Sequence, residues 1–364
     1  MKYFLNFLLL LPLSFSLQPL KAETSAFSDP KANVTDPSTR IPDSVQPLFD
    51  TFVRDTYVTL GHDGNYYLTG TTVREGRLSA RDWNIGIELW KSPDLKTWTH
   101  LGFVWEFEKD GTWQKPFFDN DTPKEFLGQT MENRHRSVLA PEIHYIDSLQ
   151  NYFIVASMPK HSGEHRTGSF ILRSTSGKPT GPFVNIEACE NGPITDRIDG
   201  ALFEDDNGDI YLLDHHDRIA KMKPDMSGWA EGFVTFKETP FPQEPYIEGG
   251  FIVKEGGKYH LLQAVWAMQL PDGTYTYNQV KNSEKYTYDC LVATADSIYG
   301  PYSKRYNAIT HGGHNNFFKD KSGKYWSTSF WNPVGIVGAS LDHSARPSII
   351  PLEFKDGRFS VDHE

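Results

Sequence analysis

The sequence has little cysteine and no excess of positive charge. Beyond its N-terminal region it has no apolar run long enough to span a membrane. Its two cysteines, Cys189 and Cys290, allow one disulfide in an exported protein or two buried free thiols, and no Cys/His spacing resembles a zinc site. The net charge of −11 disfavours nucleic acid as a partner and argues weakly against strongly anionic polysaccharides. A Gly-x-Ser-x-Gly pattern is absent, so nothing indicates a serine nucleophile elbow.

The N-terminus has the pattern of a secretory signal peptide, which we expect to end at residue 22. Lys2 provides the positive charge, Phe4 to Leu17 are largely apolar, and Ala22 is a small residue for cleavage. A membrane anchor is the alternative, but about 14 apolar residues are fewer than the roughly 20 that a spanning helix needs. A lipid anchor is not supported, because no cysteine lies near the cleavage region. The pattern therefore predicts a secreted or periplasmic protein and no membrane partner.

Residues 23–45 are rich in Ser, Thr, Pro and Asp, which favours a flexible leader. The alternative is that this segment braces the folded domain or a partner chain. We expect one domain over residues 46–364. Composition does not predict its oligomeric state.

Five repeats occupy this domain, and each consists of a short strand, a tight turn and a second strand. The second strands begin with a turn residue and an apolar or aromatic pair, as in 65–68, 151–154, 209–212, 258–261 and 324–327. The first strands are expected at 57–60, 143–146, 201–203, 251–253 and 316–318. Glycine precedes four of the second strands, as hairpin turns require.

The repeats predict an all-β fold, a five-bladed β-propeller with blades of about four antiparallel strands. Further β-prone runs between the repeats supply the outer strands, and no long stretch has helical periodicity. A β-sandwich does not explain five matching hairpins, and a β-helix has much shorter periods. Two insertions, at 103–136 and 266–288, interrupt the spacing and are candidate walls of a substrate pocket.

A polar residue lies at the start of the first strand in every repeat, 10 or 11 residues before the second strand. These residues are Asp55, Glu142, Asp199, Glu248 and His314. Because equivalent positions of a propeller are related by rotation, we expect the five side chains to form a ring at one end of the central channel. Crowded carboxylates shift one another's pKa values, so that an acid and an ionised base coexist, as hydrolysis of an acetal requires.

The motifs around these residues resemble those of glycoside hydrolase family 43, five-bladed propellers that release arabinose, xylose or galactose units. The resemblance covers about residues 50 to 335, and its elements are Arg54-Asp55, Ala140-Pro141-Glu142, Ile198-Asp199-Gly200, Tyr246-Ile247-Glu248-Gly249 and Gly313-His314-Asn315. Three positions depart from the family pattern. Thr56 replaces the proline that usually follows the first aspartate, and Gly250 lies near a position where proline is common. Leu139 stands where tryptophan is common. A related anhydrogalactosidase family has histidine where this chain has Ile247, so that alternative is disfavoured.

The resemblance implies inverting hydrolysis of a poly- or oligosaccharide, with no required cofactor. It implies that Asp55 is the general base, Glu248 the general acid and Asp199 the carboxylate that modulates the acid. It also implies that His314 lies near a water cluster or a structural calcium ion, which the histidine would hold through water. The alternative is that His314 is a channel histidine that supports the acid. A non-catalytic carbohydrate-binding propeller is the competing function.

Other residues are candidates for binding the sugar. Glu142 either binds substrate hydroxyls or pairs with Arg136 or His144. Arg197 either binds hydroxyls or pairs with an acid. The candidate aromatic platforms are Trp83, Trp105, Trp113, Trp266 and Trp331, and we favour Trp266 and Trp331 because they follow the second strands of repeats four and five.

Overall fold

The computed structural model describes most of the chain after its N-terminal region. The described residues are 36–73, 84–115, 125–126, 129–130, 137–158, 168–237, 247–269, 275–276, 286–330 and 345–364. None of the helices among them has the length and hydropathy of a membrane span.

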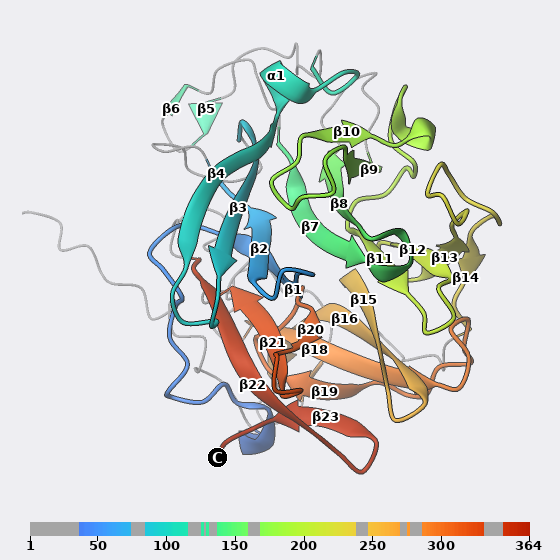
Figure 1. Ribbon diagram of the computed structural model, residues 1–364. Coiled ribbons are helices and arrows are strands. Elements are labelled where there is room, and N and C mark those ends of the chain that lie inside the picture. Colours follow the sequence, from blue (N-terminus) through green and yellow to red (C-terminus); the bar gives the residue numbers. More distant parts are fainter. Residues whose placement is uncertain are drawn as a thin grey trace, which may run out of the picture.

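Five antiparallel sheets follow one another along the chain and are arranged around a common centre (Figure 1). Blade one contains β1 (Arg54–Leu60), β2 (Tyr66–Thr71), β3 (Gly86–Ser92) and β4 (Thr99–Glu106). Blade two contains β7 (Leu139–Ile146), β8 (Asn151–Met158), β9 (Gly168–Ser174) and β10 (Phe183–Asn185). Blade three contains β11 (Gly200–Glu204), β12 (Ile210–Asp214), β13 (Arg218–Lys221) and β14 (Val234–Thr235).

The last two blades complete the propeller. Blade four contains β15 (Ile247–Glu255), β16 (Lys258–Gln269), β18 (Tyr286–Ala295) and β19 (Tyr306–Ile309), and the short β17 (Tyr275–Thr276) pairs with β16. Blade five contains β20 (Phe317–Lys319), β21 (Tyr325–Phe330), β22 (Pro347–Lys355) and β23 (Arg358–Val361). The predicted all-β, five-bladed propeller is therefore confirmed.

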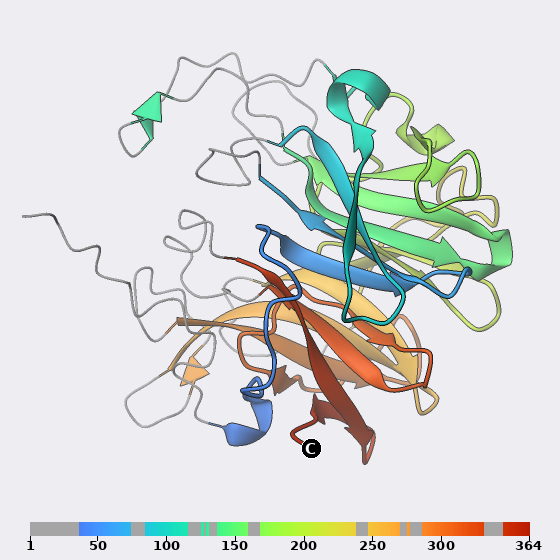
Figure 2. The same ribbon diagram turned by 60° about the vertical axis from the view of Figure 1, so that its left-hand side comes forward.

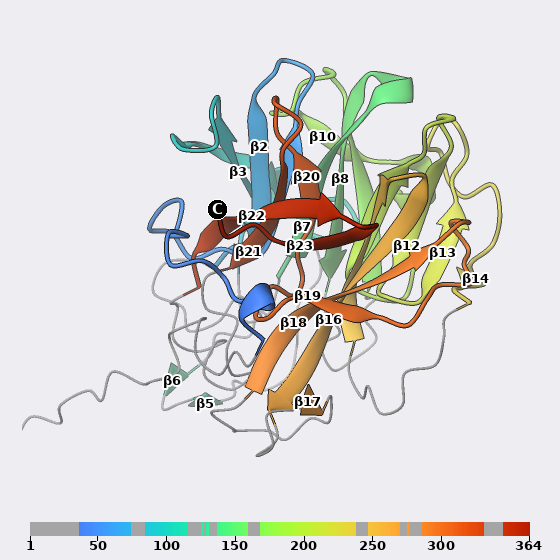
Figure 3. The same cartoon turned by 90° about the horizontal axis from the view of Figure 1, so that it is seen from below.

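The ring closes by side-by-side packing of its first and last blades. Strand β1 contacts β20, β21 and β22, although more than 250 residues separate these segments in the sequence. Figure 2 shows the blue-to-green strands of blades one and two above the orange and red strands of blades four and five. Figure 3, seen from below, shows β21 and β22 beside β2 and β3. Among the described residues, each four-stranded sheet consists of strands that are consecutive in the sequence.

Short elements connect the blades. The described helical turns are η2 (Pro37–Thr39), α1 (Phe107–Asp110), η3 (Asp147–Leu149) and η4 (Glu187–Cys189), and β5 (Glu125–Phe126) pairs with β6 (Gln129–Thr130). Strands β5 and β6 belong to the first predicted insertion, and β17 belongs to the second. These insertions therefore contain short β-hairpin pairings of their own.

The hydrophobic core lies between the blades, where strands rich in β-branched and aromatic residues face their neighbours. One cluster joins blades one to three and includes Ile154, Leu172 and Leu212, which are fully buried. A second joins blades three to five and includes Leu261 and Val292. Packing between adjacent sheets holds the inner strands, and hence the residues at their ends, at fixed positions around the axis.

Part of the expected leader packs on the propeller. Ile41 and Val45 are buried in the cluster that joins blades three to five, and the hydroxyl groups of Thr39 and Thr310 are 2.8 Å apart. Residues 1–35, which include the expected signal peptide, lie outside the described residues. The domain boundary at residue 46 stays a prediction.

The two cysteines are free and buried, which is the second of the two alternatives above. Cys189 lies in η4 and Cys290 in β18. Burial raises the pKa of each thiol to about 12, so both are protonated and unreactive at neutral pH.

Candidate active site

One residue with a positive φ angle lies near the start of the innermost strand in every blade. These residues are Asp55 (51°), Ala140 (43°), Asp199 (61°), Gly249 (58°) and His314 (54°). Residues other than glycine rarely adopt this conformation, which costs on the order of 1–3 kcal/mol and concentrates at functional sites. The five-fold repetition shows that the kink is a feature of the blade itself.

This register corrects the expected ring at two positions. Asp55, Asp199 and His314 are structurally equivalent, but Glu248 precedes Gly249 by one residue and Glu142 follows Ala140 by two. The hairpin turns differ in length: five residues separate the paired Leu60 and Tyr66, whereas four separate Lys254 and Tyr259 and six separate Tyr145 and Tyr152. Counting back from the second strand therefore selects non-equivalent positions in blades two and four.

The three predicted catalytic carboxylates nevertheless converge on His314. Its Nδ1 lies 3.3 Å from Asp55 Oδ1, and the side chain is 9 % exposed. Burial alone lowers the pKa of His314, but the negative charges of Asp55, Asp199 and Glu248 outweigh it, so the net shift is upward. A positive charge on His314 would therefore be stabilised between acids from three different blades.

Asp55 is held from two sides. Besides His314, the hydroxyl of Thr71 on β2 donates a hydrogen bond of 2.7 Å to Asp55 Oδ2. The same Thr71 oxygen accepts the backbone N–H of Ala140 at 2.7 Å. Thr71 thus links the carboxylate of blade one to the kink of blade two.

Glu248 accepts a hydrogen bond from the hydroxyl of Tyr288, at 2.5 Å. Tyr288 lies on β18 and is fully buried. Burial and the nearby charge of Glu248 raise the pKa of Tyr288 well above its ordinary value, so it stays a neutral donor. Sequence reasoning missed Tyr288 because it lies on the third strand of its blade, outside the repeated motif.

Asp199 is the most buried of the three carboxylates. Its backbone N–H donates to Ser157 Oγ at 2.8 Å, and its Oδ2 lies 3.4 Å from Nδ1 of His215. His215 lies in the turn between β12 and β13 and also has a positive φ angle, 65°. This histidine was likewise not predicted, because a turn residue carries no repeated signal.

Glu142 belongs to a separate buried chain of polar groups. Its Oε2 lies 3.0 Å from His144 Nε2, and His144 Nδ1 lies 2.9 Å from the hydroxyl of Tyr57. Burial, with the charges of Asp199 and Asp55, raises the pKa of Glu142 well above its ordinary value, while burial lowers the pKa of His144 to about 3. Of the alternatives for Glu142, pairing with His144 is present; Arg136 lies outside the described residues.

The other predicted sugar-binding residues are paired with other groups, buried in the core or outside the described residues. Arg197 pairs with Asp217 through its guanidinium group. Trp266 lies within β16 and not after it, and its side chain, like Trp331 and Trp83, falls outside the described part of the structure. Trp105 is fully buried and belongs to the core, and the indole N–H of Trp113 donates to the carbonyl of Cys189 at 2.8 Å.

The described residues offer no direct metal site. No group of three His, Cys, Asp or Glu side chains among them is arranged to hold an ion. The Nδ1 of His314 faces a carboxylate, and calcium prefers oxygen ligands. A calcium ion held by His314 through water stays a prediction.

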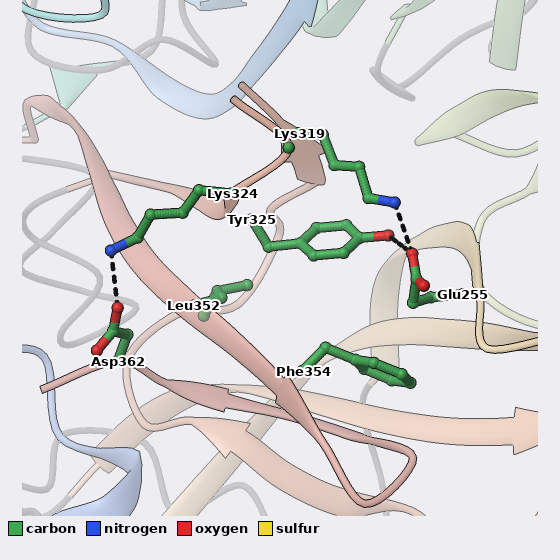
Figure 4. A pocket seen from close by; sticks show the side chains of 8 residues that line it. Glu255, Lys319, Lys324, Tyr325, Leu352, Phe354 and Asp362 are labelled. Atoms are coloured by element: carbon green, nitrogen blue, oxygen red, sulfur yellow. Dashed lines mark hydrogen bonds and ion pairs between the residues drawn. The ribbon is translucent and has the colours of Figure 1, made fainter. Parts of the chain in front are cut away.

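A surface pocket of about 400 Å³ lies in blade five and next to the β15–β16 turn (Figure 4). Its charged groups are paired with each other: Lys319 with Glu255 and Lys324 with Asp362, both at 2.7 Å. The hydroxyl of Tyr325 also donates to Glu255. None of the catalytic candidates lines this pocket, so we do not assign it to the active site.

Comparison with known proteins gives consistent matches. The sequence profile of "Glycosyl hydrolases family 43" matches residues 45–359. A β-D-galactofuranosidase, xynD of Aspergillus niger, is 27 % identical over 256 residues, which are 66 % of this chain and 64 % of that protein. The chain thus spans about two thirds of the length of this relative.

Solved structures share the fold at lower identity. A thermostable family-43 glycoside hydrolase has a TM-score of 0.61 at 20 % identity, covering 88 % of this chain and 96 % of that one. An endo-arabinase from Bacteroides thetaiotaomicron has a TM-score of 0.58 at 19 % identity, covering 86 % and 98 %. The profile match spans most of the chain, and the structural matches agree with its five blades. This chain therefore belongs to glycosyl hydrolase family 43 and is a glycoside hydrolase of the propeller fold.

Proposed function

We propose that this protein hydrolyses a glycosidic bond of an oligo- or polysaccharide with inversion, using Asp55 as base, Glu248 as acid and Asp199 as the third carboxylate. The observation that carries the proposal is the convergence of these three groups, each from a different blade, around the buried His314. An inverting reaction needs two carboxyl groups on opposite sides of the scissile bond, with room for a water molecule.

Asp55 is suited to the role of the base. Thr71 donates to one of its oxygens and His314 approaches the other, so the carboxylate is held in a fixed orientation. In the proposed reaction Asp55 accepts a proton from water as that water attacks the anomeric carbon.

Glu248 is suited to the role of the acid. Tyr288 donates to Oε1, which leaves Oε2 to hold the proton that passes to the leaving oxygen. Asp199 is buried, and its charge and that of Glu248 both act on His314, which is where a third carboxylate that modulates the acid would stand. Glu142, Arg197, Trp266 and Trp331 remain candidates for binding the sugar.

The substrate class that we propose contains arabinose, xylose or galactose units. The relative from Aspergillus niger is named a β-D-galactofuranosidase, so β-D-galactofuranosides belong in the first panel of substrates. Export to the periplasm or the medium, proposed from the N-terminal pattern, fits a polysaccharide substrate.

The test is hydrolysis of nitrophenyl furanosides and pyranosides and of oligosaccharides by the wild type and by Glu248→Gln. We expect activity on at least one substrate, and a decrease of roughly 10²-fold or more in the variant. Proton NMR of the first product should show the inverted anomer. Full activity of Glu248→Gln would remove the proposed acid, and sugar binding without hydrolysis by the wild type would favour a carbohydrate-binding role.

A further inference from the structure

We infer that His215 is a positioning residue that fixes Asp199 of blade three relative to the strand bearing Glu248 in blade four. This inference rests on the proposed function, since it assigns the support of its third carboxylate. His215 lies in the turn between Asp214 and Arg218. Its side chain contacts Asp199, and its backbone carbonyl contacts Gly250.

The side chain of His215 faces Asp199. The ion-pair distance from Nδ1 to Oδ2 is 3.4 Å, and the side chains are 18 % and 4 % exposed. The positive φ angle of 65° gives the turn the conformation in which this contact forms. A strained, non-glycine residue that touches a buried carboxylate indicates a functional requirement more than a requirement of the turn.

The backbone of His215 holds blade four. Its carbonyl accepts the N–H of Gly250 at 2.6 Å, two residues after Glu248. A Cβ atom on residue 250 would lie 2.8 Å from this carbonyl oxygen and 3.0 Å from the Cα of His216, so the approach requires glycine. A proline at this position would also lack the N–H. One turn residue thus contacts both the third carboxylate and the segment that carries the acid.

The turn itself is anchored. Asp214 is fully buried, and it accepts hydrogen bonds from Thr195 Oγ1 at 2.6 Å and from Arg218 Nε at 2.7 Å. The base of the turn is therefore held in blade three, and movement of His215 relative to Asp199 is restricted.

Charges around His215 favour its cationic form. Burial and the charge of Arg197 lower the pKa of His215. The ion-pair contact with Asp199 and the charges of Asp199 and Glu248 raise it by more, so the net shift of the pKa is upward. The ring of His216 lies edge-on, with a centroid distance of 4.7 Å, and its own pKa is lowered to about 4 by burial and by His215. At pH values between the pKa of His216 and its own raised pKa, His215 is therefore the cationic member of the pair, and it loses its charge as the pH rises through that raised pKa.

The experiment compares His215→Gly and His215→Asn in the full chain. Both residues tolerate a positive φ angle, so backbone strain is matched. The asparagine amide nitrogen stands near the place of Nδ1, whereas glycine removes the contact. We expect kcat of His215→Gly to fall about 10- to 100-fold with little change in KM, because a displaced carboxylate misaligns the acid. His215→Asn should recover most of kcat.

The pH dependence separates positioning from folding. Both variants remove a cation, which raises the pKa of neighbouring carboxyl groups, so their pH–rate profiles should move to higher pH. Gly250→Ala, which displaces the same turn but keeps the histidine, should lower kcat without that shift. His260→Asn is the control for a destabilised blade: His260 is a buried histidine on β16 whose Nε2 contacts the carbonyl of Glu255 at 3.1 Å.

Two results would overturn this inference without affecting the proposed function. One is a wild-type kcat and pH profile in His215→Gly. The other is a loss of kcat that follows the decrease in melting temperature in the same way as in His260→Asn. In both cases an inactive Glu248→Gln would leave the proposed function intact. Full activity of Glu248→Gln would instead overturn the proposed function, and this inference with it.

Discussion

Each carboxyl group of the site lies beside a side chain that can donate a proton or a hydrogen bond. The pairs are Asp55 with His314, Asp199 with His215, Glu248 with Tyr288 and Glu142 with His144. Four acids in one channel would repel one another in water-poor surroundings, and these partners reduce that repulsion. The partners also differ in character, since histidines accompany the two aspartates and a neutral phenol accompanies the proposed acid.

A pair of threonines on β2 tests the support of Asp55. Thr71→Val removes the hydroxyl that donates to Asp55, and Thr69→Val removes one that donates to the carbonyl of Pro141 at 2.6 Å. Both hydroxyls are buried and accept a backbone N–H of blade two, so each variant should lose about 1–3 kcal/mol of stability. Only Thr71→Val should also lower kcat, by roughly 10-fold, measured on the best substrate. Equal kcat values in the two variants would contradict the role of Thr71.

The inner strand of each blade is the element that delivers a residue to the axis. Its register shifts at a bulge in blades one, two and four, next to the residue with positive φ. A bulge re-aims the side chains that follow it, so a strand can end its regular pairing and turn a polar residue toward the channel. Blades two and four differ, because Ala140 and Gly249 take the kinked position there: Glu142 follows the first by two residues and Glu248 precedes the second by one.

Two glycines of blade four test this arrangement. Gly249 has φ of 58°, and a Cβ atom there would lie 2.6 Å from Cδ2 of His314. Gly257 has φ of 74° in the β15–β16 turn, where a Cβ atom meets nothing within 4 Å. Alanine at either position should cost about 1–2 kcal/mol of strain, seen as a lower melting temperature. Gly249→Ala should also lose more than roughly 10-fold in activity, since it displaces His314 among the catalytic acids. Full activity in Gly249→Ala would show that the close packing is not required.

At the scale of the whole molecule, the ring closes through packing between blades one and five. The N-terminal segment 36–45 adds to this ring, because η2 contacts β19 and β23 and Ile41 is buried in the core. The predicted domain start at residue 46 would omit these contacts.

Truncation of the chain measures how much the contacts of residues 36–45 contribute to stability. A chain that begins at residue 46 should melt at a lower temperature than one that begins at residue 36, because burial of Ile41 and Val45 is lost. Loss of a buried isoleucine side chain typically costs about 2–5 kcal/mol. The comparison uses thermal melting and denaturant unfolding of both chains, with Ile41→Ala in the longer chain as a separate check. Identical stabilities would show that the propeller begins at residue 46.

The sequence by itself determined the five repeats, the propeller and the candidates Asp55, Asp199 and Glu248, because hairpins and inner strands leave a local pattern that recurs. It could not place Glu248 and Glu142 correctly in the ring, since the lengths of the hairpin turns differ by single residues between blades. Only the tertiary structure identified Tyr288, His215 and Thr71, which come from second and third strands and from a turn. The physical reason is that these contacts form across blades or sheet strands, and no local propensity records which distant side chain will meet a carboxylate.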